Sequence, residues 1–131
     1  LARRRLCPVI GPGDNYVSSI HVDGAAAARV AALAVPAGVY NVVDDEPVPM
    51  REYVAALTDA FGFKKAFHLP LGIARIAFGP SVEAFTRSQR VNNTMFKAVS
   101  PWRPRYPSVR QGWRAVAEAM RGVPDATQGQ K

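Results

Sequence analysis

The sequence has 131 residues, 48% hydrophobic and 21% charged, a composition that indicates one globular domain and excludes a disordered chain. Its single cysteine, Cys7, excludes an intrachain disulfide and a cysteine metal site and favours a reducing, cytoplasmic location. No apolar run approaches the roughly 20 residues that span a bilayer, so we expect no membrane partner. The first residue is Leu1 rather than methionine, and we expect the chain to begin inside a longer reading frame.

The positive charge is unevenly distributed. The formal net charge is +7, but residues 64–121 alone hold 11 basic and 2 acidic residues, a net charge of +9. This balance indicates either an anionic partner, such as a nucleic acid or a phosphate-bearing small molecule, or a solvated basic surface. Both interpretations stay open at this point.

The first half of the chain alternates between expected strands and helices. The expected elements are the end of a helix at 1–6, strands at 7–10, 16–22 and 39–43, a turn at 11–14, and helices at 25–34 and 50–61. We expect Asp23 to cap the first complete helix, with Val30 and Leu33 on one face. The apolar spacing of 50–61 and the glycine that follows, Gly62, favour a helix with a left-handed cap. This helix–strand–helix order is typical of an α/β layered fold.

The second half is less regular. We expect a helix from about 69–72 to 78, a further turn to 87 capped by Ser81, a brief strand at 90–91, a helix at 94–99 capped by Asn92 or Asn93, and a final helix ending at Gly122. Three prolines exclude regular helix from 101–107. Ser108 and Gln111 are spaced as a capping box. Residues 125–131 should form a flexible tail after one domain at 1–124.

The usual cofactor and metal motifs are absent from the sequence. Gly11 and Gly13 match the first two positions of a dinucleotide fingerprint, but the third position is Tyr16 and no helix follows. The two histidines lack metal-ligand spacing. The acidic run 44–46 could bind a divalent cation but is more typical of a solvated turn, so we predict no metal site.

An aromatic and basic cluster lies at residues 102–110. Its tryptophan, tyrosine and arginines could stack on and pair with single-stranded nucleic acid. We favour the other interpretation, in which Trp102 and Tyr106 fill a core, because no nucleic-acid module is recognisable.

Four segments in order resemble one family. Residues 16–23 (YVSSIHVD) resemble the "IHVDD" junction of extended short-chain dehydrogenase/reductases, and 38–47 (GVYNVVDDEP) resemble their "GxYNvxxxxP" strand. Residues 88–93 (SQRVNN) and 102–107 (WRPRYP) resemble the tail that precedes their last helix. The resemblance is to the C-terminal portion of this NAD-dependent epimerase/dehydratase family and spans residues 1–120.

The resemblance implies a fold, and it implies that the cofactor-binding and substrate-binding parts lie in different portions of the protein. The implied fold class is α/β: the C-terminal part of a Rossmann-type protein, with 39–43 as a late sheet strand and a small substrate-side α/β lobe. The family's NAD or NADP loop and its catalytic Tyr-x-x-x-Lys lie elsewhere, and none of the four tyrosines here has a lysine four residues on. No catalytic or cofactor-binding residue is therefore assigned to this chain.

The resemblance also implies substrate contacts at Tyr16, Ser18, Ser19 and Arg90. Arg90 is the candidate phosphate ligand because its guanidinium can bind a phosphate with two hydrogen bonds. The family's other phosphate-facing arginine is missing from 17–19, and Gly24 replaces an aspartate. Both departures weaken a nucleotide-sugar assignment.

Two functional hypotheses follow. The first is part of an NAD(P)-dependent epimerase/dehydratase-like oxidoreductase or isomerase, inactive alone and prone to self-association through an open sheet edge. The alternative is an independent basic module that binds nucleic acid or another polyanion. Sequence leaves open the substrate, the reaction (reduction, epimerisation or dehydration) and the choice of NAD or NADP.

Overall fold

The structure, a computed structural model, describes residues 7–64 and 66–122. The expectations for 1–6 and 125–131 lie outside the described residues. Within the described parts, no helix combines the length and apolar character needed to cross a membrane.

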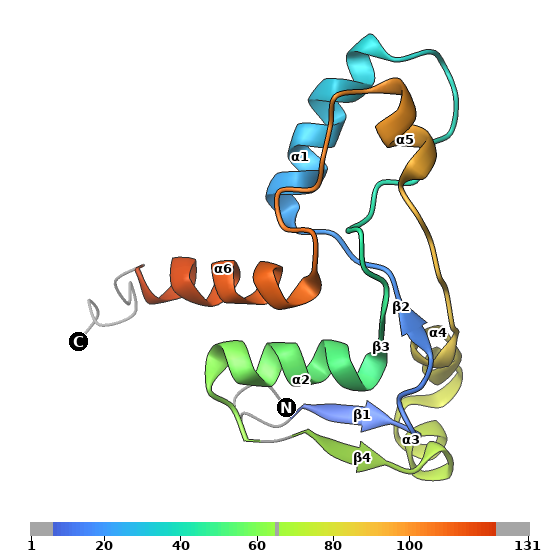
Figure 1. Cartoon of the computed structure of the whole chain (residues 1–131). Helices are drawn as coiled ribbons and strands as arrows, with labels where there is room; N and C mark the ends of the chain where they lie inside the picture. The colour runs from blue at the N-terminus through green and yellow to red at the C-terminus, as the bar shows by residue number, and fades with distance from the viewer. Residues whose placement is uncertain (1–6, 65, 123–131) are drawn as a thin grey trace, which may run out of the picture.

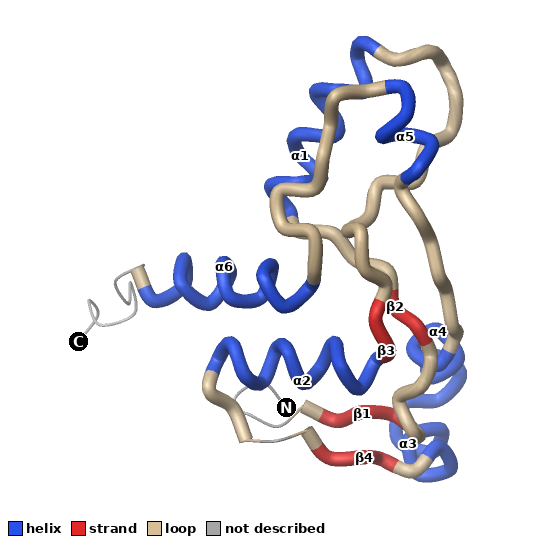
Figure 2. Tube along the Cα trace, viewed as in Figure 1, coloured by secondary structure: helices blue, strands red, loops and turns tan. Residues whose placement is uncertain are grey.

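The described residues form a mixed α/β structure (Figures 1 and 2). The helices are α1 (Val22–Ala31), α2 (Met50–Phe61), α3 (Leu71–Phe78), α4 (Val82–Thr86), α5 (Thr94–Val99) and α6 (Val109–Arg121), with 3-10 turns η2 (Ala32–Ala34) and η3 (Gly79–Ser81). The strands are β1 (Pro8–Ile10), β2 (Tyr16–Val17), β3 (Val48–Pro49) and β4 (Phe67–Leu69). The predicted α/β fold class is confirmed.

The strands form two short pairs. Strands β1 and β4 are parallel, with Val9 opposite His68, and β2 and β3 are antiparallel, with Val17 opposite Val48. The predicted strand at 39–43 is wrong in detail, because the described residues give it no strand partner and leave Val39 93% exposed. The parallel pair is made by β1 and β4 instead. A β-branched run favours a strand, but it does not indicate which partner strand the segment would join.

The elements are arranged along the length of the molecule. Figure 1 shows α1 and α5 at one end, α6 lying along α2 in the middle, and β1 and β4 on the other side of α2. Helices α3 and α4 lie at the far end, beside the start of β2. The segment between β2 and α1 and the segment that leads into β3 connect the two ends, so the middle of the molecule is where distant parts of the sequence meet.

The core at the α1 end is centred on Trp102. This side chain is 5% exposed and packs with Phe96 and Ala28, and its ring centroid lies 5.3 Å from that of Phe96. Its indole Nε1 donates a hydrogen bond of 3.0 Å to the carbonyl of Gly24. The expectation of a core residue is confirmed for Trp102 but not for Tyr106, which is half-buried and stands edge-on to His21. Small residues on α1 allow the large Trp102 ring to approach the helix backbone.

Helix α1 differs from the prediction in its cap and in its buried face. The cap is His21, whose Nδ1 accepts a hydrogen bond from the backbone N–H of Asp23, and Asp23 lies inside the helix. Val30 and Leu33 are 70% and 88% exposed, so the apolar face expected from them is open. The tryptophan packs against small residues, which a pattern of large apolar side chains does not predict.

Gly62 and Gly13 both have a positive φ angle, but they differ in how much space surrounds the position of a Cβ atom. Gly62 ends α2 at φ +63°, as predicted, with open space where a Cβ would lie. Gly13 has φ +72°, and a Cβ there would lie 2.5 Å from Val9 Cγ1 and 3.1 Å from the backbone N of Arg51. Gly13 therefore allows the turn after β1 to lie close against the start of α2.

Other boundaries differ from the expected ones: the strand expected at 16–22 covers only Tyr16–Val17, and Val22 already begins α1. Residues 90–91 form no strand, which corrects that prediction. Helix α5 begins after Asn93, and Asn92 Oδ1 accepts from the N–H of Thr94 at 3.2 Å. Ser108 is the N-cap of α6 as expected, but its side chain makes no capping hydrogen bond.

Candidate functional site

A groove runs between the start of β2, the start of α2 and the segment that follows α4. Its volume is about 650 Å³. It is lined by Asn15, Tyr16, Val17, Ser18, Met50, Tyr53, Ala84, Arg87 and Gln89. Two of the four predicted site residues, Tyr16 and Ser18, therefore line one groove.

Hydrogen bonds join residues 16–18, on the β2 side of the groove, to residues 88–91, which follow α4. The N–H of Tyr16 donates to Ser88 Oγ at 3.0 Å, and the N–H of Gln89 donates to the Tyr16 carbonyl at 3.0 Å. The Ser18 hydroxyl donates to the Gln89 carbonyl at 3.1 Å and accepts from the N–H of Val91 at 2.9 Å. Ser18 therefore fixes the backbone, and its hydroxyl is already engaged.

Arg90 lies beside Tyr16 rather than in the lining of the groove. Its guanidinium carbon is 3.5 Å from the centroid of the Tyr16 ring, which is cation–π geometry. The same side chain borders a second hollow of about 440 Å³, together with Asp45 and Lys97. The structure thus brings Arg90, Tyr16 and Ser18 together.

The cation that lines the groove itself is Arg87, which sequence reasoning missed. Among the described residues, neither Arg87 nor Arg90 has an acidic partner within ion-pair distance. Both side chains are exposed. The sequence feature that could have identified Arg87 is its position three residues before Arg90, at the end of α4. Two unpaired cations beside one groove favour an anionic group there.

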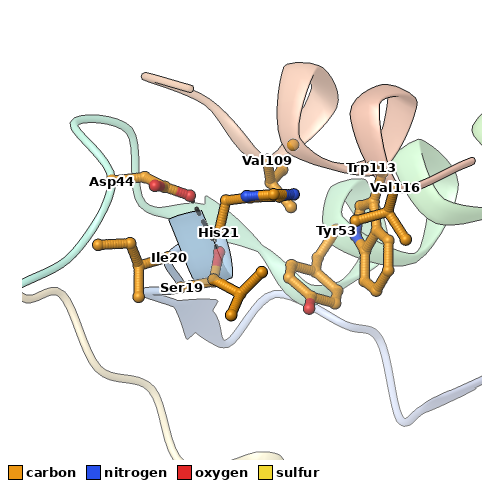
Figure 3. Close-up of a pocket in the computed structure, with 10 residues that line it drawn as sticks. Ser19, Ile20, His21, Asp44, Tyr53, Val109, Trp113 and Val116 are labelled. Atoms are coloured by element: carbon orange, nitrogen blue, oxygen red, sulfur yellow. Dashed lines mark hydrogen bonds between the residues drawn. The ribbon is translucent and has the colours of Figure 1, made fainter. Parts of the chain in front are cut away.

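Ser19 faces a separate, smaller cavity (Figure 3). This cavity, of about 180 Å³, lies between α6, α2 and the segment that enters α1. It is lined by Ser19, Ile20, His21, Val22, Asp44, Tyr53, Val109, Gly112, Trp113 and Val116. Tyr53 borders both the groove and this cavity, so its ring lies between them.

Asp44 is the buried acid of the cavity. It is 6% exposed, and its Oδ2 accepts a hydrogen bond from the Ser19 hydroxyl at 3.5 Å. Burial raises the pKa of Asp44 to about 6, because water no longer stabilises the charge. The His21 backbone and the Ser19 hydroxyl lower the pKa in part, and neighbouring Asp45 raises it. Burial, with a smaller effect of Asp44, also raises the pKa of Tyr53.

The three carboxylates of the acidic run point to different partners. Asp45 Oδ1 accepts from Lys97 Nζ at 2.8 Å and from Asn93 Nδ2 at 2.7 Å, and these contacts lower its pKa although burial opposes them. Glu46 contacts Arg110 at 3.3 Å. No group of three possible metal ligands occurs among the residues that the structure describes.

The arginines of the 102–110 cluster contact the protein itself. Arg103 donates to the carbonyl of Trp102 at 2.6 Å, and Arg105 lies 3.4 Å from the carboxylate of Asp23. Arg110 bridges Glu46 and Glu52 and so ties α6 to α2.

The glycine-rich turn does not fit a dinucleotide. Gly13 is buried against Val9 and Arg51, so its lack of a side chain serves internal packing rather than the approach of a pyrophosphate. The turn leads into β2 and not into a helix whose N-terminus could hold phosphate. This turn therefore lacks the geometry of a dinucleotide-binding loop.

Comparison with known proteins gives one consistent fold. No model of a known protein family matches the sequence. The chain is similar to a conserved protein of unknown function from Silicibacter pomeroyi (29% identity, TM-score 0.74, 86% of this chain and 41% of that one). It is similar to the human epimerase family protein SDR39U1, solved with NADPH (22% identity, TM-score 0.76, 86% and 39%). RMD from Pseudomonas aeruginosa, also complexed with NADPH, matches at 19% identity and a TM-score of 0.58 over 87% and 34%.

A curated protein is similar as well. The 3-diazoavenalumate denitrifying reductase of a Streptomyces species is 30% identical over 107 residues, which are 80% of this chain and 35% of that protein. The chain thus spans between a third and two-fifths of the length of the proteins it matches. It has the fold of part of an extended short-chain dehydrogenase/reductase, and the predicted resemblance is confirmed.

Proposed function

We propose that this chain is the substrate-side part of an NAD(P)-dependent reductase or epimerase, and that it performs no hydride transfer alone. The observation that carries the proposal is its fold: 86% of the chain superposes on a protein solved with NADPH. The sequence has no Tyr-x-x-x-Lys pair, and the Gly11–Gly13 turn does not fit a dinucleotide. The other half of the site, with the cofactor, would come from residues outside this sequence.

The groove beside Tyr16 is the proposed place for the substrate. Arg87 lines it and Arg90 lies against the Tyr16 ring, so an anionic group such as a phosphate or carboxylate would find two unpaired cations. The reductase named among the relatives favours reduction over epimerisation as the reaction of the whole protein. A nucleotide-sugar substrate, the narrower form of this proposal, would place its diphosphate at these arginines.

The groove is tested by titrating the full chain with inorganic pyrophosphate, observed by NMR. Arg87→Gln and Arg90→Gln should each weaken binding about 3- to 10-fold, and the double variant should abolish it. Arg29→Gln, which removes an exposed arginine of α1, is the matched control and should bind as the parent does. Equal weakening by all three substitutions would indicate a general charge effect and contradict the assignment.

The polyanion alternative gains little support from the structure. Three arginines of the 102–110 cluster contact protein carbonyls or carboxylates, and a nucleic-acid backbone would have to compete with these contacts. A low-salt gel shift with single-stranded DNA tests this alternative. A retarded band that weakens steeply with added salt would favour it over the substrate-side role.

A further inference from the structure

The geometry points to a second binding site: the cavity between α2 and α6, which we propose takes a small, planar, uncharged molecule that both donates and accepts a hydrogen bond. Its donor would meet Asp44 and its acceptor would meet Trp113. This inference goes beyond the proposed function, because it needs neither the groove, nor a cofactor, nor hydride chemistry.

Two buried polar atoms of the cavity lining carry the argument. Within the described part of the chain, Asp44 Oδ1 and Trp113 Nε1 are buried and have no hydrogen-bond partner. The first can accept a hydrogen bond and the second can only donate one. An unmatched buried polar group costs roughly 1–3 kcal/mol, so a ligand that supplies both missing partners gains specificity from both atoms.

The apolar walls of the cavity favour a flat ring as the body of the ligand, with one polar group at its edge. Tyr53 and Trp113 stand edge to face with ring centroids 5.7 Å apart. The side chains of Ile20, Val109 and Val116 complete the apolar lining. In Figure 3 the side chains of Val109, Val116, Tyr53 and Trp113 lie on one side of His21, and those of Asp44, Ser19 and Ile20 lie on the other. An aromatic ring therefore suits the space better than a sugar, whose many hydroxyls would be left unpaired.

The volume sets the size of the ligand. A cavity of about 180 Å³ is small beside the roughly 300 Å³ at which drug-sized pockets begin. An engineered protein cavity of about 150 Å³ binds benzene. One substituted ring is therefore the expected occupant. Both polar atoms are covered by their neighbours, so the ligand has to shift wall side chains slightly to reach them.

The charge of the Asp44 carboxylate and the unpaired Trp113 donor together disfavour an ionised ligand. An anion would meet the Asp44 carboxylate in a buried setting, at a large desolvation cost. A cation would pair with Asp44 but would leave the Trp113 donor unmatched. A neutral amide or hydroxyl group carries both functions at once.

The two tryptophans provide a direct test on the full, ¹⁵N-labelled chain. The Trp113 indole N–H should shift on titration with benzamide or phenol, in a saturable way. The Trp102 indole N–H, already bonded to Gly24, should stay in place and serves as the internal control. Toluene, a similar ring without polar groups, should bind at least 10-fold more weakly, as should benzylamine.

Substitutions complete the test. Trp113→Phe keeps a ring but removes the donor, and it should weaken benzamide binding about 5- to 10-fold by calorimetry. Asp44→Asn should also weaken binding, whereas Glu118→Gln, at an exposed acid on α6, should not.

Several results would overturn the inference. These are no saturable shift up to millimolar probe, which would mean that water alone fills the cavity, movement of both indole signals together, or equal binding of toluene. The parent titration does not depend on either variant folding. Pyrophosphate binding at the groove is measured separately, so either site can fail alone.

Discussion

Replacing Asp44 by asparagine should stabilise the protein at neutral pH and have little effect in acid. The Asp44 carboxyl is buried, and burial raises its pKa from the ordinary 3.8 to about 6. In the unfolded chain the same carboxyl ionises at its ordinary pKa. Between these two values the folded state holds a proton that the unfolded state has lost, so stability falls as pH rises through this window.

The size of the effect follows from the two pKa values. Ionising Asp44 in the folded protein costs at most about 3 kcal/mol above pH 7, relative to pH below 4. Because Asp44 lines a cavity that opens to the surface, solvent screening reduces the expected cost to about 1–2 kcal/mol. Asparagine keeps the shape and one acceptor for the Ser19 hydroxyl but carries no charge. The variant should therefore gain about 1–2 kcal/mol at pH 8 and close to nothing at pH 4.

Urea unfolding followed by tryptophan fluorescence measures this difference. Parent and variant are compared at pH 4, 5, 6, 7 and 8 at one protein concentration, because association would alter the apparent stability. Other groups, including Asp45 with its lowered pKa, are present in both chains and cancel in the comparison. The gain should rise between pH 4 and 6 and level off above pH 7.

Two results would refute the reasoning. A constant loss of stability at every pH would mean that Asp44 acts through a hydrogen bond that asparagine cannot replace. A gain that is independent of pH would mean that the carboxyl ionises normally.

Three further predictions concern packing and association. Gly13→Ala should lower the free energy of unfolding by about 2–4 kcal/mol and Gly62→Ala by about 1 kcal/mol, because only the first adds a close contact to the unfavourable φ; equal losses in urea unfolding would contradict this. Trp102→Phe should cost about 1–3 kcal/mol, since the Gly24 carbonyl loses its buried donor, and an unchanged urea midpoint would show that water replaces it. The chain should self-associate through exposed apolar side chains such as Ile76, which is 90% exposed; Ile76→Lys should shift sedimentation towards monomer, and a parent that is monomeric at high concentration would remove the premise.

The sequence predicted correctly those elements whose structure depends mainly on their own residues. Helix α2 has both an apolar stripe and a glycine at the left-handed position, and its predicted bounds match the structure. The wrong predictions concern features that depend on contacts with residues far away in the sequence. Leu33 was expected on an apolar face, but α1 presents small residues to Trp102, more than 70 positions away along the chain. Extended backbone at 39–43 was expected to join a sheet, and the partner of a strand cannot be read from its own composition.

The same distinction applies to the candidate site. The resemblance brought Tyr16, Ser18 and Arg90 forward, and the structure places these three side by side, with Ser19 in the other cavity. Arg87 could have been found from its position just before the same segment. The Asp44 cavity could not, because its walls come from three stretches whose approach depends on the packing of α6 against α2.

The central claim is that this chain supplies the substrate side of an NAD(P)-dependent protein and not its cofactor site. Titration of the purified full chain with NADPH, followed by nicotinamide fluorescence and by calorimetry, tests this claim most directly. No change in nicotinamide emission and no heat of binding are expected up to millimolar NADPH. Saturable binding in the micromolar range would contradict it, because such affinity requires a dinucleotide site within these 131 residues.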